Sequence, residues 1–143
     1  MKKFLSILLL VFTYLGLQGQ DPQELISQCA LDIGENTTYL KDFVIKLPPA
    51  SDPSDAPVYK ANFYFMKNQN YRFTMCNSES SGGELVLALY DKQKLITTSF
   101  LKSSDKVYSS VDFACNKTGL YQLWYTFKDG QKGYGVGIVS LVK

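Results

Sequence analysis

Apolar and polar residues alternate with a period of two along most of this chain, the pattern of β-strands that bury one face. From Val58 onward, short apolar runs with this period are separated by polar turns such as "KNQN", "NSESSGG" and "KDGQKG". These runs predict strands at 61–66, 71–76, 84–90, 95–100, 110–115, 120–127 and 135–142. With a first strand in "YLKDFVIKLP", they predict an all-β fold, an antiparallel, jelly-roll-like β-sandwich of about 7–8 strands.

The segment "DPQELISQCALDIG" has a different period. Its apolar residues recur at spacings of three and four between Pro22 and Gly34, which predicts a short amphipathic helix over 22–33 packed against the sandwich. These residues are Leu25, Ile26, Cys29, Ala30 and Ile33. The proline-rich stretch "PPASDPSDAP" follows the first strand and predicts an exposed loop. We expect 20–57 and the sandwich core, 58–143, to form one domain.

Alternation also assigns the two faces of each strand. The residues expected in the core are Phe63, Phe65, Tyr71, Phe73, Met75, Val111, Phe113, Tyr121, Leu123, Tyr125 and Phe127. The strand at 84–90 is apolar on both faces, which indicates a central strand whose outer surface is covered. The helix over 22–33 is the expected cover.

Trp124 stands out because its neighbours on the outer face of its strand, Gln122 and Thr126, are polar. Such a tryptophan can be a platform on which a sugar ring or another flat ligand stacks, with Tyr64 or Tyr134 beside it. The alternative is that the helix or the proline-rich loop covers it.

The first residues, "MKKFLSILLLVFTYLGLQGQ", have the layout of a secretory signal peptide: two lysines, an apolar run, then small and polar residues. We expect cleavage after Gly19, so that 1–19 are removed. The apolar run is short for a bilayer span, which needs about 20 residues. The sequence therefore predicts a secreted or periplasmic protein of bacterial type, with no integral membrane segment after the signal is removed.

The charge balance argues against nucleic acid as a partner. Removal of Lys2 and Lys3 with the signal takes the 15 basic residues to 13, equal to the 13 acidic ones. No basic cluster remains to neutralise phosphates.

The chain has three cysteines, Cys29, Cys76 and Cys115. Exported chains meet an oxidising compartment, so one disulfide is expected and one thiol is left over. The pair Cys76–Cys115 is favoured because both end a strand and precede an asparagine. Alternation counts against it, since Cys115 shares the core face while Cys76 opposes Met75. A bridge from Cys29, or no bridge, are the alternatives.

Candidate catalytic and metal chemistry is sparse. The chain has no histidine, so zinc sites and histidine-assisted nucleophiles are excluded, and we expect no cofactor and no metal. Asp52 and Asp55 are more typical of solvated loop residues than of a calcium site. Paired carboxylates for glycoside hydrolysis remain open, though nothing marks a pair. The four candidates are Glu84, Asp91, Asp105 and Asp112.

Four stretches together resemble a bacterial family: "NFYFMKNQNYRFTMC", "LVLALYDKQKLI", "VDFACNKTGLYQLWYTF" and "YGVGIVSLV". They are similar to the pre-peptidase C-terminal domain, a small sandwich also similar to the Golgi-dynamics (GOLD) type. The G-x-Y at Gly119–Tyr121 and the L-x-L-Y-D at 87–91 carry most of the resemblance, which covers about 58–142. It implies an accessory module without catalytic residues.

Three functions follow as hypotheses. A carbohydrate- or envelope-polymer-binding module predicts an exposed Trp124 with neighbouring tyrosines. A structural or assembly partner of a cell-envelope protein predicts an apolar edge or helix face without a small ligand. An enzyme predicts a carboxylate pair in a cleft, and it is the least favoured.

Overall fold

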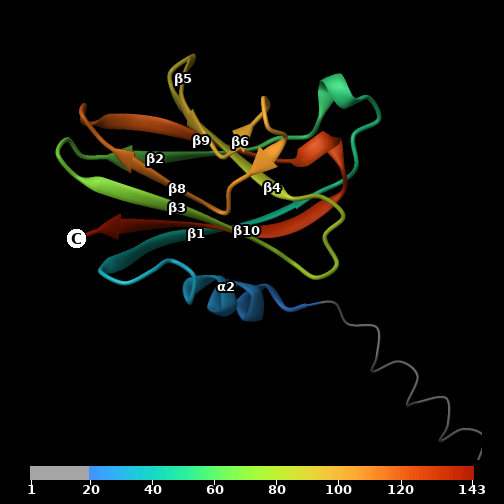
Figure 1. Ribbon diagram of the computed structural model, residues 1–143, viewed down its shortest axis with the longest axis horizontal. Coiled ribbons are helices and arrows are strands. Elements are labelled where there is room, and N and C mark those ends of the chain that lie inside the picture. Colours follow the sequence, from blue (N-terminus) through green and yellow to red (C-terminus); the bar gives the residue numbers. More distant parts are fainter. Residues whose placement is uncertain (1–19) are drawn as a thin grey trace, which may run out of the picture.

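A computed structural model describes residues 20–143 of the chain, so the predicted signal peptide, 1–19, lies outside the described residues. The helix α2 spans Pro22–Ala30, and short 3-10 helices lie at Pro53–Asp55 and Lys128–Gly130. The strands are β1 (Thr37–Leu47), β2 (Tyr59–Phe65), β3 (Asn70–Asn77), β4 (Leu85–Asp91), β5 (Lys94–Thr98), β6 (Phe100–Leu101), β7 (Lys106–Val107), β8 (Ser110–Ala114), β9 (Gly119–Phe127) and β10 (Gly133–Val142). Figure 1 labels most of them.

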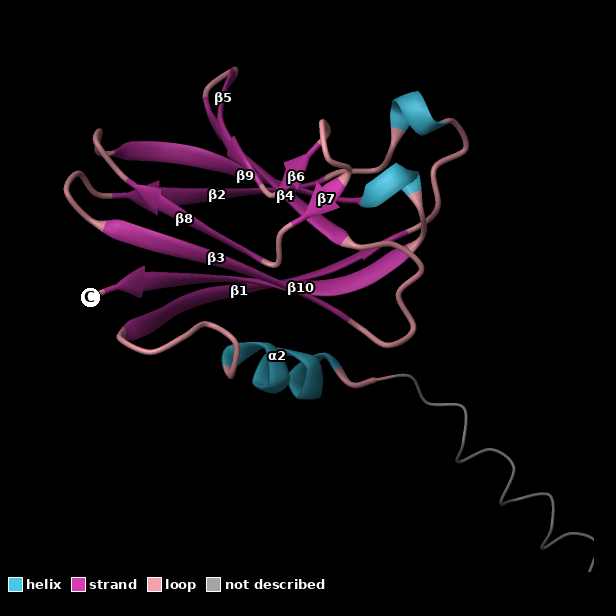
Figure 2. Cartoon of the chain, viewed as in Figure 1, coloured by secondary structure: helices cyan, strands magenta, loops and turns pink. Residues whose placement is uncertain are grey.

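Two four-stranded antiparallel sheets form the sandwich. Sheet A has the order β1-β10-β3-β8, and sheet B has the order β2-β9-β4-β5. Successive strands β1 to β4 alternate between the sheets, and the first and last strands are neighbours, an arrangement of jelly-roll type. Figure 2 shows the two layers of strands with α2 outside them. The predicted all-β sandwich is confirmed.

One predicted strand is divided in two. The sequence predicts a strand over 95–100, but β5 ends at Thr98, and β6 pairs with β7 in a separate hairpin. Ser99 lies fully buried at the break, where its Oγ accepts a hydrogen bond of 2.8 Å from the backbone N–H of Leu87. The serine hydroxyl thus replaces a ladder bond to β4, and the chain leaves sheet B at this point.

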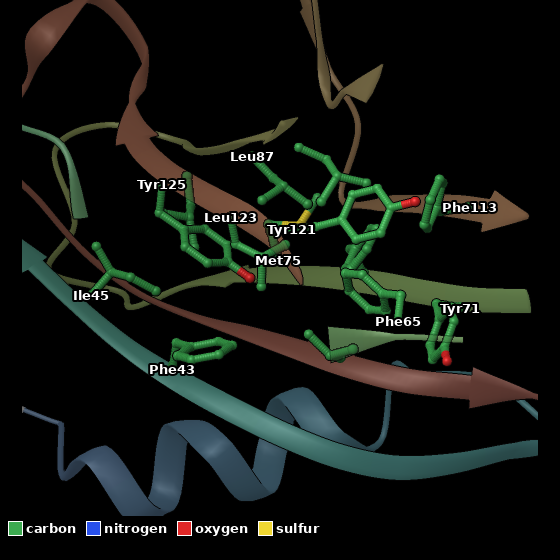
Figure 3. Close-up of a cluster of buried hydrophobic side chains, with 14 of the residues drawn as sticks. Phe43, Ile45, Phe65, Tyr71, Met75, Leu87, Phe113, Tyr121, Leu123 and Tyr125 are labelled. Carbon is green, nitrogen blue, oxygen red and sulfur yellow. The ribbon is translucent and has the colours of Figure 1, made fainter. Parts of the chain in front are cut away.

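The core lies between the two sheets (Figure 3). It contains the residues that alternation assigns to it, of which Phe63 and Val111 are only partly buried, together with side chains of β1, β4 and β10. Phe65 is fully buried, and its ring centroid lies 4.5 Å from that of Tyr71 and 5.5 Å from that of Tyr121. Aromatic pairs in such edge-to-face contact add to the stabilisation that area burial gives. The core prediction is therefore confirmed along β2, β3, β8 and β9.

Helix α2 packs on the outer face of sheet A, below β1 and β10 in Figure 1. Asp21 caps the helix by accepting a hydrogen bond from the N–H of Gln23, and Pro22 begins it. Leu25 and Cys29 are buried against Val136 and Ile138 of β10. The helix ends at Ala30, earlier than the predicted residue 33.

The expectation that this helix covers β4 is wrong. Strand β4 belongs to sheet B, whereas α2 packs on sheet A. Strand β10 provides the apolar surface on which α2 packs. Its Val136 and Ile138 point away from the main core and are fully buried under the helix. The outer face of β4 is occupied differently, by Tyr90 packed on Trp124.

The disulfide joins Cys29 to Cys76, and Cys115 is free and buried, so the predicted pair Cys76–Cys115 is wrong. Cys115 bonds through its backbone N–H to Gln69, at the start of β3, while Cys76 lies at the far end of β3, about 20 Å away along the strand. Cys76 also faces outward toward α2, whereas Cys115 faces the core. The two thiols therefore lie on opposite faces of sheet A and near opposite ends of β3, too far apart to form a bond.

Candidate functional site

Trp124 lies on the outer face of sheet B, in the middle of β9, as the alternation predicts. Its neighbours along β9, Leu123 and Tyr125, are fully buried in the core, whereas Trp124 is only half-buried. Across the sheet it pairs with Lys60 of β2 on one side and with Ala88 of β4 on the other. Helix α2 packs on the opposite sheet and does not cover it.

Three side chains hold the indole ring in place. The Tyr90 ring centroid lies 4.5 Å from that of Trp124 at an interplanar angle of 41°. The Lys60 ammonium lies 4.0 Å from the ring centroid, within cation–π distance. The indole N–H donates a hydrogen bond of 3.0 Å to Oε1 of Gln122. The ring is therefore fixed in orientation by its own neighbours on the sheet.

Strand register places further side chains around this ring. Gln122 pairs with Tyr90, which pairs with Leu95 of β5, and Tyr64 of β2 pairs with Leu120. Tyr64 and Leu120 are each 60% exposed, and Leu95 is 48% exposed. We call this surface the tryptophan face; it consists of Lys60, Tyr64, Tyr90, Leu95, Leu120, Gln122 and Trp124. Within the described residues, Lys60 is the single charge that the four strands place on it.

The three predicted binding residues do not form one cluster. Tyr64 shares the tryptophan face with Trp124, about 13 Å away along the strands. Tyr134 lies on β10 in sheet A, on the other side of the molecule, so the expectation that it neighbours Trp124 is wrong. Its hydroxyl donates to the backbone oxygen of Gln20, and its ring packs in the small cluster under α2.

Lys60 and Tyr90 belong to the site but were not predicted as binding residues. Alternation already puts Tyr90 on the outer face of its strand. That Tyr90 and Lys60 meet Trp124, however, depends on the strand order β2-β9-β4 and on its register. A single sequence does not specify which strands are neighbours, so the contact between Tyr90 and Trp124 could not be predicted from it.

Three of the candidate catalytic carboxylates are engaged in ion pairs. Oδ1 of Asp112 lies 2.7 Å from Nε of Arg72. Oδ2 of Asp105 lies 3.0 Å from Nζ of Lys128, and Oδ2 of Asp91 lies 3.8 Å from Nζ of Lys117. The hydrogen bond from Arg72 holds the pKa of Asp112 below its usual range, so this carboxyl stays ionised. A carboxyl that acts as a general acid needs a raised pKa, the opposite of the shift at Asp112.

Asp52, weighed above as a calcium ligand, accepts a hydrogen bond from the N–H of Ser54 and so caps the short helix that follows it. In the described structure, the Asp52 carboxylate thus stabilises the start of the short helix Pro53–Asp55. In residues 20–143, no helix reaches the length and apolarity needed to cross a bilayer.

No protein-family model matches this chain, and no curated protein matches it either. The sequence and the geometry described above therefore carry the functional argument.

Proposed function

We propose that this chain is an exported, non-catalytic β-sandwich protein that binds a carbohydrate or another envelope polymer through the tryptophan face. The observation that carries the proposal is the fixed pair of Trp124 and Tyr90 on a sheet face that α2 leaves uncovered. Aromatic rings held in place bind flat apolar surfaces at a low cost in conformational entropy.

The polar side chains of the face suit a ligand rich in hydroxyl groups. The side-chain amide of Gln122 has donors left over after it accepts from the indole, and Tyr64 adds an exposed hydroxyl. A ring that stacks on Trp124 would displace the Lys60 ammonium, and an exposed cation–π contact is worth only about 0.5–1 kcal/mol. The released Lys60 would then be free to donate to ligand oxygens or to pair with an acidic group.

A non-catalytic role is supported by the state of the acidic residues. Asp91, Asp105 and Asp112 each pair with a basic side chain from another part of the chain, which favours structural roles over a catalytic pair. The accessory-module function implied by the pre-peptidase C-terminal resemblance belongs to this same proposal. Jelly-roll sandwiches include lectin domains, but fold alone does not decide function.

Export to a bacterial periplasm or exterior is also part of the proposal. The Cys29–Cys76 disulfide supports it, because such bonds persist in oxidising compartments. The residues of the predicted signal peptide lie outside the described part of the chain.

The second candidate is a structural or assembly partner of an envelope protein. It is supported by the exposure of Tyr64, Leu120 and Leu95, which gives the tryptophan face an apolar character that also suits a protein surface.

The test is co-sedimentation of the protein with insoluble peptidoglycan and with neutral and acidic polysaccharides, comparing Trp124→Ala with Tyr108→Ala. Tyr108 is a suitable control because it is an exposed aromatic residue that also lies under a lysine and stands outside the strands of sheet B. We expect one polymer to bind the parent and the Tyr108→Ala variant but not the Trp124→Ala variant. If no polymer binds the parent, or if both variants bind it equally, polymer binding by this face is wrong.

A further inference from the structure

The sandwich has four edge strands, and they differ in how they are protected. An edge strand presents unpaired backbone N–H and C=O groups, and proteins guard such edges with bulges, charges or short length. In sheet A, β1 carries a bulge between Tyr39 and Lys41, and the five-residue β8 has Asp112 at its centre. In sheet B, β5 also has five residues, a register shift against β4 and Lys94 at its start.

Strand β2 is the least protected of the four, because it has no bulge and Lys60 is its one guard. It has seven residues, runs in unbroken register against β9, and has one charge, Lys60. No proline lies within it. In residues 20–143, the backbone groups of 59–65 that point away from β9 have no hydrogen-bond partner. The edge is therefore open for one more antiparallel strand.

The sequence of β2 and its flanks is complementary to itself. When two copies pair antiparallel about Asn62, Ala61 meets Phe63, so that a small residue meets a large one twice by symmetry. Lys60 meets Tyr64 of the partner subunit, a cation–aromatic pair like the one that Lys60 makes with Trp124. No two like charges stand opposite each other in this register.

The ends of the paired segment also match. Val58 meets Met66 of the partner subunit, and both are exposed apolar residues in the single chain. Met66 borders an apolar groove of about 470 Å³ at this edge, lined also by Leu40, Phe63 and Tyr71. Pro57 precedes the segment, and proline cannot extend a ladder, so the pairing ends there.

We propose that the protein forms a two-fold symmetric dimer by antiparallel pairing of β2 with β2 of a second copy. The pairing joins the two B sheets into one continuous sheet. The two tryptophan faces then lie side by side on the same surface, which would let one polymer chain engage both. The dimer itself does not depend on polymer binding.

The test is sedimentation velocity of the purified protein over a concentration series, with variants at the symmetry axis. Asn62 is exposed, so Asn62→Lys is compatible with the single chain, yet in the dimer it sets two lysines opposite each other. We expect Asn62→Lys to weaken dimerisation about fivefold at low salt. Ser110→Lys makes the same charge change on the exposed edge strand β8 and should leave dimerisation as in the parent.

A mixing experiment tests the register. Asn62→Asp alone should also weaken the dimer, whereas an equimolar mixture of Asn62→Asp and Asn62→Lys should form mixed dimers, because residue 62 then meets an opposite charge. A parent that stays monomeric over the whole series overturns the proposal. So does a dimer that Asn62→Lys and Ser110→Lys affect equally, or a mixture that does not re-form dimers. If the edge of β2 instead pairs with a strand of another protein, the purified parent stays monomeric.

Discussion

The disulfide between Cys29 and Cys76 joins helix α2 to the end of β3 across the outer face of sheet A. The two cysteines are separated by 47 residues in the sequence. Cys29 also packs with Leu25 on Val136 and Ile138, a cluster separate from the main core. The bond therefore fastens the helix over a second small core and does not hold the two sheets together.

Removal of this bond should lower stability while leaving the sandwich folded. A loop of this length predicts a loss of about 4 kcal/mol for Cys29→Ser or Cys76→Ser, measured by urea unfolding followed by circular dichroism. Cys115→Ser is the control that keeps the bond. A denatured but unreduced parent should give one thiol in a thiol assay, at Cys115, and a labelled peptide containing Cys29 or Cys76 would contradict the pairing.

Gly137→Ala should destabilise the protein by about 1–3 kcal/mol. A Cβ at Gly137 would lie 2.5 Å from Cζ of Tyr125, whose ring is fully buried in the core. Gly119→Ala, in β9 of the other sheet, is the matched control, because a Cβ there meets no atom within 4 Å. Thermal unfolding of both variants would decide; equal melting temperatures would show that the ring is not the obstacle.

Tyr125→Phe should raise the free energy of unfolding by about 1 kcal/mol. The Tyr125 hydroxyl is buried without a hydrogen-bond partner among the described residues, so its removal ends an uncompensated desolvation. Urea unfolding at neutral pH measures the effect. Tyr121→Phe is the contrasting variant, since the Tyr121 hydroxyl donates a bond of 2.6 Å to the backbone oxygen of Lys117 and its loss should destabilise. A loss of stability in Tyr125→Phe would contradict this account.

Stability should fall as the pH rises above about 10, the ordinary tyrosine pKa. Burial raises the pKa of Tyr125, and burial with a hydrogen bond to the Cys115 thiol raises the pKa of Tyr121 to about 12. In this window the unfolded chain releases protons that the folded chain keeps, so the free energy of unfolding decreases with pH. Tyr125→Phe should flatten the decrease, by up to about 1.4 kcal/mol per pH unit. An unchanged slope would exclude Tyr125 as a source.

The alternation of residues was sufficient to predict the core faces of β2, β3, β8 and β9 and the outward position of Trp124. Pairing between distant segments was not predictable in the same way. The sheet on which α2 packs depends on β10 lying between β1 and β3, and the partner of Cys76 depends on that helix. Alternation already placed Cys76 and Cys115 on opposite faces of their sheet, which argued against a bond between them, and in the structure they are not bonded.

The same distinction applies to the candidate site. Tyr134 and Tyr64 looked equivalent as neighbours of Trp124, because a sequence does not say which sheet a strand joins. Tyr134 lies in sheet A and Tyr64 in sheet B. Lys60 and Tyr90, the side chains that fix the indole, are separated from it by 64 and 34 positions in the sequence, so only the strand register reveals them.

The most direct test of the proposed function is a titration of the parent protein, followed by the fluorescence of Trp124, its only tryptophan. The titrants are soluble fragments of peptidoglycan and of neutral and acidic polysaccharides. The account predicts that one of them shifts or quenches the emission saturably, because the ligand replaces Lys60 at the ring. An emission spectrum that no polymer alters, from a protein whose circular dichroism shows it to be folded, would contradict polymer binding at the tryptophan face.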